Sequence, residues 1–146
     1  METRLLAITS LLFIGIAGYA YSNGAFEYAA LSAITGLISA NYWRDATFGY
    51  RRVADLVFSK ISFAIYFVSG FTFCYNTPLY NPAMFLNFCI LFSYYMSFRQ
   101  FCHKNPNWIY YHALFHCFAT IEKYAILQCY IEFVRRLEAS AAKLPY

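Results

Sequence analysis

The chain has 146 residues, of which 61% are hydrophobic, 23% are aromatic and 12% are charged. Soluble domains average about 25% charged residues, so this composition argues against a soluble domain and favours helices that lie in a lipid bilayer. The net charge of +4 comes from Lys and Arg residues scattered between apolar runs, without the basic stripe of a nucleic-acid-binding protein. We therefore expect lipid surroundings and no nucleic-acid partner.

The apolar runs predict an all-α integral membrane bundle with about five transmembrane helices in one domain, residues 1–146. In chain order the predicted spans are residues 5–21, 25–42, 53–74, 82–98 and 107–133. Short loops connect them, and Gly, Asn and Pro mark three of the four loops. Pro82 suits the first turn of the fourth helix, where its missing N–H costs nothing.

The first apolar run also resembles a signal peptide. Arg4 precedes the run, and the sequence AGYA at its end is a candidate cleavage site. Because more apolar runs follow, we expect the first helix to be retained.

The distribution of basic residues predicts the topology. The N-terminus and the second and fourth loops share one side, and they carry Arg4, Arg44, Arg51, Arg52, Arg99 and Lys104. The opposite side has basic residues only in the tail, namely Arg135, Arg136 and Lys143. The positive-inside rule then places the N-terminus in the cytoplasm and the tail on the far side. The organelle stays open.

Two histidines stand out inside the fifth span. His112 and His116 are four residues apart, so they project from the same face of a helix. That spacing allows two imidazoles to bind one metal ion. The alternative is that each histidine forms a hydrogen bond with a neighbouring helix. Haem ligation is disfavoured, because two histidines on one face cannot occupy opposite sides of one iron.

Ser39 lies near the end of the second span, and Asp55 lies near the start of the third. The predicted topology places both at the same depth in the bilayer as the histidine pair. Asp55 also has a structural explanation, since Arg51 and Arg52 precede it by four and three residues and an acid suits a helix N-terminus. A lone serine in a membrane helix usually bonds to its own backbone or packs at a close helix contact. The shared depth nevertheless predicts a polar site within one leaflet.

Glu122 and Lys123 lie near the middle of the fifth span, where an ionisable residue needs a reason. We expect them to find partners on other helices. Lys123 is seven residues after His116 and points nearly the same way. A cation on that face would disfavour a second metal ion and favour an anionic ligand group.

These residues resemble the CREST superfamily of membrane hydrolases, which includes the alkaline ceramidases and the progestin and adiponectin receptors. Ser39 matches the serine of the family pattern, Asp55 the aspartate, and His112 and His116 in "YHALFH" the pair on the last helix. The resemblance implies hydrolysis of a lipid amide, with Ser39 and Asp55 as catalytic residues. It implies zinc as the cofactor, held by His112 and His116.

The chain departs from that pattern in two respects. Trp43 stands where the family has its first zinc-binding histidine, and we count five spans where the family has seven. Two interpretations therefore stay open. One is a zinc-dependent hydrolase relative that acts in lipid metabolism, and the other is a non-enzymatic bundle that serves as an assembly or lipid-binding subunit. A channel or transporter is disfavoured, because no inverted repeat is visible.

Overall fold

The computed structural model describes residues 3–47 and 49–142, and every regular element within these ranges is a helix. The elements are α1 (Thr3–Ser10), α2 (Leu12–Ser22), α3 (Phe26–Arg44), α4 (Tyr50–Phe73), α5 (Tyr80–Cys102) and α6 (Trp108–Ala141). The all-α prediction is confirmed over this part of the chain. Lys143 of the basic tail lies outside the described residues.

Each predicted span coincides with a helix, and α6 runs well beyond the predicted end at residue 133. The first span is divided into α1 and α2 at Leu11, where two backbone bonds of 3.0 Å join residues three apart, as in a 3₁₀ turn. Two helical stretches of the described chain, Thr3–Ser22 and Tyr50–Phe73, are long and apolar enough to cross a membrane. α3, α5 and α6 are long enough but carry more polar and charged residues.

Tight turns end the helices. Gly24 (φ 77°) follows α2 and Lys104 (φ 55°) follows α5, both in the left-handed region. At each turn the next amide bonds back to a carbonyl five residues earlier, at 2.9 Å and 3.0 Å, which satisfies a carbonyl left free by the helix end. Pro82 lies in the first turn of α5, as predicted.

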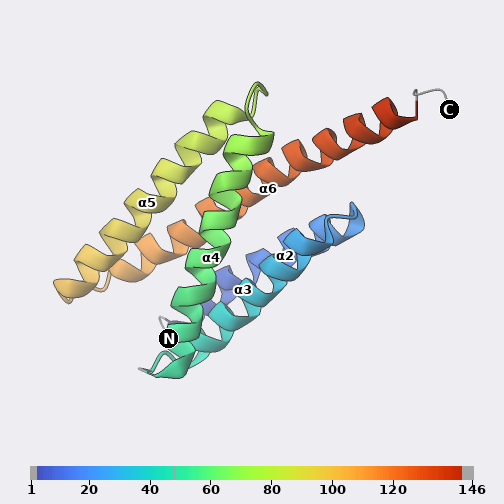
Figure 1. Cartoon of the computed structure of the whole chain (residues 1–146). Coiled ribbons are helices and arrows are strands. Elements are labelled where there is room, and N and C mark those ends of the chain that lie inside the picture. The colour runs from blue at the N-terminus through green and yellow to red at the C-terminus, as the bar shows by residue number, and fades with distance from the viewer. Residues whose placement is uncertain (1–2, 48, 143–146) are drawn as a thin grey trace.

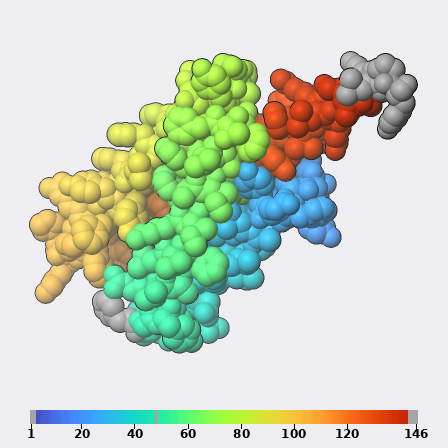
Figure 2. Space-filling model, in the orientation of Figure 1, coloured from blue at the N-terminus to red at the C-terminus, as the bar shows by residue number. Residues whose placement is uncertain are grey.

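The bundle consists of two helix pairs that α4 joins. α5 lies along α6, α2 lies along α3, and α4 contacts α3, α5 and α6 (Figure 1). The C-terminal part of α6 projects beyond the other helices, and residues 132–142 are exposed apart from the half-buried Val134. A recess separates α4 from α5 on the face shown in Figure 2.

The bundle buries polar side chains and exposes apolar ones. On α4 the buried side chains include Asp55, Ser62, Tyr66 and Ser69, whereas Val53, Val57, Ile61, Ile65 and Val68 are exposed. On α5 the buried side chains include Asn87, Ser93 and Ser97, whereas Phe85, Phe88, Leu91 and Phe92 are exposed. A helix on the surface of a soluble protein shows the opposite distribution.

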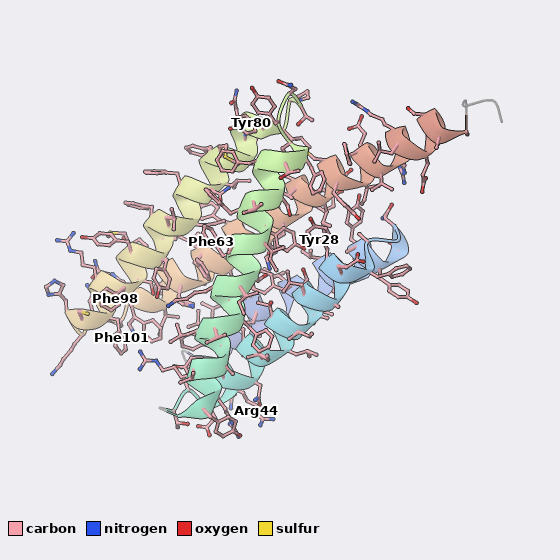
Figure 3. The ribbon with its side chains drawn as sticks, viewed as in Figure 1. Tyr28, Arg44, Phe63, Tyr80, Phe98 and Phe101 are labelled. Atoms are coloured by element: carbon pink, nitrogen blue, oxygen red, sulfur yellow. The ribbon has the colours of Figure 1, made fainter. Side chains whose placement is uncertain are left out.

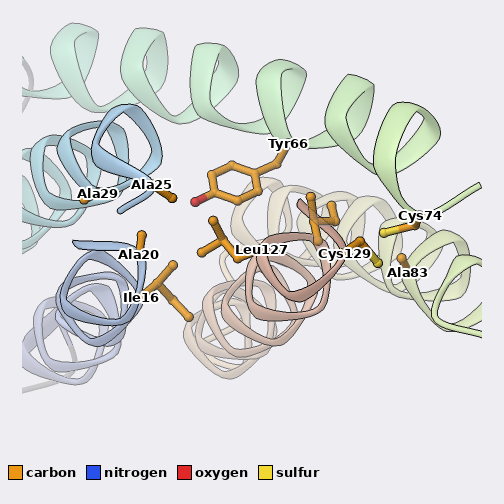
Figure 4. Close-up of a cluster of buried hydrophobic side chains, with 10 residues drawn as sticks. Ile16, Ala20, Ala25, Ala29, Tyr66, Cys74, Ala83, Leu127 and Cys129 are labelled. Carbon is orange, nitrogen blue, oxygen red and sulfur yellow. The ribbon is translucent and has the colours of Figure 1, made fainter. Parts of the chain in front are cut away.

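Tyr66 occupies the centre of the largest cluster of buried side chains. Its ring projects from α4 into the space between the helices, near Ala20, Ala25 and Leu127 (Figure 4). Its hydroxyl forms a 2.9 Å hydrogen bond with Ser32 of α3. The small side chains of Ala20 and Ala25 beside the ring allow the helices to approach closely.

Gly36 marks the closest approach of α3 to the first two helices. A Cβ atom at this position would lie 3.1 Å from Cβ of Phe13 and 3.1 Å from the carbonyl oxygen of Ser10. Because one of these neighbours is backbone, the two helices would have to separate. Gly15 of α2 is the matched control, since a Cβ atom there would meet nothing within 4 Å.

We predict that Gly36→Ala lowers the free energy of unfolding by about 1–3 kcal/mol, the usual cost of overpacking. Gly15→Ala should leave stability unchanged or raise it by up to about 1 kcal/mol, because Ala favours the helix. Thermal unfolding of the purified variants, followed by circular dichroism, measures both effects. Equal melting temperatures for the two variants would contradict the close contact at Gly36.

Candidate functional site

A cavity of about 250 Å³ lies where the N-terminal ends of α1, α4 and α6 meet the C-terminal ends of α3 and α5. Its walls are mainly aromatic, with Trp43, Tyr94, Phe98, Phe101 and Trp108. Figure 3 shows Phe98 and Phe101 at this end of α5 and Arg44 at the corresponding end of α3. The predicted depth of the polar site matches this location.

The polar side chains that line the same cavity include Arg52 and Asp55 from α4, Ser97 from α5, and His112 from α6. Asp55 is 6% exposed, so its carboxylate faces the cavity rather than bulk solvent. Because Asp55 follows Arg52 by three residues, both lie on neighbouring positions of one helix face. A carboxylate, a guanidinium and an imidazole therefore meet in an otherwise apolar chamber.

Asp55 is held by hydroxyl groups on two helices. The Ser59 hydroxyl donates a hydrogen bond to Oδ1 of Asp55 at 3.5 Å, and the Ser39 hydroxyl of α3 also interacts with this carboxylate. Ser39 in turn accepts a 3.0 Å hydrogen bond from Ser10 of α1. Of the two arginines expected near Asp55, Arg51 has its guanidinium 4.0 Å from Asp45 in the preceding loop.

The two histidine rings lie side by side, with centroids 5.0 Å apart and planes at 82°. Nδ1 of His116 is 2.8 Å from the Thr9 hydroxyl of α1, and Nδ1 of His112 is 3.3 Å from the Ser97 hydroxyl of α5. Each histidine therefore bonds to a neighbouring helix, as the structural alternative predicts. His112 reaches the cavity, whereas His116 packs against Phe13 at 5.8 Å between ring centroids.

The residues present do not fit the zinc centre that the resemblance implies. Within residues 3–47 and 49–142, no group of three or more His, Cys, Asp or Glu side chains could hold a metal ion. The ring of Trp43 packs against the ring of His112, with 4.8 Å between the centroids. Trp43 stands at the position where the family has one of its three zinc-binding histidines. An indole cannot take the place of an imidazole as a ligand, since its nitrogen only donates a hydrogen bond.

Trp43 has a role that the sequence did not suggest. It is 7% exposed and lines the cavity. Its Nε1–H has no hydrogen-bond partner, although buried donors are rarely left without one. The cluster of Tyr42, Trp43 and Trp108 at one depth was the available signal.

No family model, curated protein or solved structure matches the chain. The resemblance to the CREST hydrolases therefore stays a prediction from the residues alone.

Zinc content tests the donor arrangement directly. We predict that the detergent-purified protein contains no stoichiometric zinc by elemental analysis, and that His116→Ala leaves the metal content unchanged. The same variant should be destabilised by about 1–3 kcal/mol, because it removes a buried ring and its hydrogen bond with the Thr9 hydroxyl.

His103→Ala is the control, because His103 is exposed in the turn after α5. Stoichiometric zinc that His116→Ala removes and His103→Ala retains would restore the zinc interpretation.

Proposed function

We propose that this chain is a multi-pass membrane protein whose helical bundle binds a lipid in the cavity beside Asp55. The membrane location is supported by which side chains are buried and which are exposed. Hydroxyl, amide and charged groups are buried, and large apolar side chains are exposed on every long helix. In water this surface would cost roughly 25 cal/mol per Å² of exposed apolar area. A bilayer removes that cost, while the buried polar groups bond to one another.

Exposed apolar side chains on α5 and α6 extend this argument beyond the two most apolar helical stretches. They include Phe85, Phe88, Leu91 and Phe92 on α5, and Tyr110, Leu114 and Ile121 on α6. Residues that face the interior, such as Asn87, Ser93, Glu122 and Lys123, lower the average hydropathy of these helices. Composition alone therefore understates how apolar their outer faces are.

The cavity end of the bundle is the proposed cytoplasmic end. Arg44, Arg51 and Arg52 flank the loop between α3 and α4, and Arg99 and Lys104 lie at the end of α5. The C-terminal part of α6 points away from this end (Figure 1). The positive-inside rule supports this orientation.

We predict that cysteines at the two ends of the bundle label from opposite sides of sealed vesicles. Cys102 is free and exposed at the end of α5, and Thr47 is exposed in the loop between α3 and α4. Tyr75, which is 62% exposed after α4, represents the other end. A membrane-impermeant maleimide should label Cys102 and Thr47→Cys from one side.

The far side is tested in a Cys102→Ser background. There, Tyr75→Cys should react with the same reagent only from the opposite side. Labelling of Tyr75→Cys and Thr47→Cys from the same side would exclude this topology.

The cavity supports a lipid as the bound molecule. Its walls are aromatic, which suits an acyl chain, and its polar groups include a cation at Arg52, an acceptor at Asp55 and the unpaired donor Nε1–H of Trp43. Ligand pockets usually combine a mostly apolar lining with a few polar groups that fix orientation. A volume of about 250 Å³ accommodates part of a lipid, so the rest would extend into the bilayer.

We predict that filling the cavity expels the lipid. Leu56→Trp adds bulk to the cavity wall and should lower the lipid that co-purifies in mild detergent by about tenfold, because overpacking costs 1.4 kcal/mol or more. Val57→Trp is the matched control, since Val57 is the next residue and is exposed on the outer face. Mass spectrometry of extracted lipids measures the difference. Equal lipid content in both variants would contradict binding in this cavity.

Hydrolysis of the bound lipid is the second candidate function. One observation favours it: Asp55 and His112 line the same cavity, with Ser39 against Asp55. A carboxylate and an imidazole around one chamber are groups that activate water or transfer protons. Incubation of the protein with lipid amides and esters separates the candidates. Products that Asp55→Asn abolishes support an enzyme, whereas unchanged lipid with normal binding supports a binding protein.

A further inference from the structure

A second polar centre lies in the middle of α6, away from the cavity. Glu122 is 1% exposed and Lys123 is 3% exposed. Although they are adjacent in sequence, they form no ion pair within 4.0 Å of each other among the described side chains. The two side chains instead point to different helices.

The amino group of Lys123 contacts one hydroxyl group and two aromatic rings. Its Nζ donates a 2.6 Å hydrogen bond to the Ser62 hydroxyl of α4. The same nitrogen lies over the ring of Phe13 at 4.5 Å and over the ring of Tyr66 at 4.7 Å. Two aromatic faces and a hydroxyl oxygen therefore surround the amino group on the side of α2 and α4.

Glu122 faces α5, where it meets Asn87. Oε1 of Glu122 and Oδ1 of Asn87 both lack a hydrogen-bond partner, and they are the two buried acceptor atoms in this condition within the described chain. The Asn87 amide nitrogen donates to the Ala83 carbonyl at 3.0 Å, which fixes the orientation of the amide group. Beside the hydrogen-bonding interaction between the two side chains, each therefore carries one acceptor atom that has no donor.

We propose that Glu122 is a proton-binding site inside the bundle. The neutral carboxyl group donates its O–H to Oδ1 of Asn87, and this single proton satisfies the bond that both side chains lack. Binding is the reaction of the carboxylate with a hydronium ion, which gives the carboxylic acid and water. The titratable groups around the site are Lys123 on α6 itself and Tyr66 and Cys74 on the side of α4.

A polar route connects this site to the large cavity. A small cavity of about 20 Å³ borders Glu122, Lys123, Ser59 and Ser62, which is room for one water molecule. Ser59 also bonds to Asp55, which faces the large cavity. In this proposal the proton exchanges along the sequence Asp55, Ser59, water and Glu122, from the end of the bundle that holds the large cavity.

Infrared spectroscopy of the detergent-purified protein at neutral pH tests the site. A protonated carboxyl group gives a carbonyl band separate from the band of carboxylates, and the band shifts in D₂O. We expect this band in the wild type, its loss in Glu122→Gln, and its persistence in Glu132→Gln. Glu132 is the matched control, because it lies on the same helix but is exposed and paired with Arg136. Persistence in Asp55→Asn separates Glu122 from the other buried carboxyl group.

Asn87→Leu provides a second readout, because it keeps the carboxyl group and removes its acceptor. The carbonyl band should persist and move to higher frequency. Absence of the band in the wild type, or its persistence in Glu122→Gln, would overturn the proposed site. An unchanged band position in Asn87→Leu would overturn the bond to Asn87.

The exchange route has its own test. Ser59→Ala should slow the D₂O shift of the band at least several-fold relative to Ser69→Ala, which removes a buried hydroxyl elsewhere on α4. Equal exchange rates in these two variants would overturn the route through Ser59.

Discussion

Hydrogen bonds between hydroxyl groups on α3 and α4 are the contact on which the rest of the bundle depends. Tyr28 pairs with Ser69 at 2.7 Å, Ser32 pairs with Tyr66 at 2.9 Å, and Ser39 lies against Asp55 nearer the cavity. Each such bond contributes only about 0.6 kcal/mol on average between membrane helices. Their effect on structure is larger than their energy, because they fix the rotation of α4. That rotation places Asp55 in one cavity and Ser62 under Lys123.

The same supply of hydroxyl groups gives each histidine of α6 a hydrogen-bond partner on a neighbouring helix. Thr9 and Ser97 each occupy one ring nitrogen, so α1 and α5 draw the two imidazoles toward different partners. Within the described chain, the buried side-chain nitrogen and oxygen atoms that lack a hydrogen-bond partner are Nε1 of Trp43, Oδ1 of Asn87 and Oε1 of Glu122. Since an unpaired buried polar group is costly, these atoms indicate where a ligand or a proton completes the structure.

α4 connects the two polar centres. Asp55, Ser59 and Ser62 follow one another along its inner face at intervals of four and three residues. The first faces the large cavity, and the other two border the small one. A lipid bound beside Asp55 would therefore lie at the start of the path to Glu122, which links the two proposed sites through one helix face.

Helix positions were predictable from the sequence because apolar runs and turn residues act over short distances. Each predicted span falls on helices, although the first is divided at Leu11, and Pro82 lies in the first turn of α5 as expected. Lys123 shares the face of His116, since both contact Phe13. The sequence also placed Ser39, Asp55 and His112 at one depth. Side-chain partners were not predictable, because they depend on the rotation and spacing of helices distant in the chain. Only the tertiary structure shows that Trp43 lines the cavity and that Arg51 lies near Asp45. It also shows that Lys123 bonds to Ser62 of α4, whereas Glu122 interacts with Asn87 of α5.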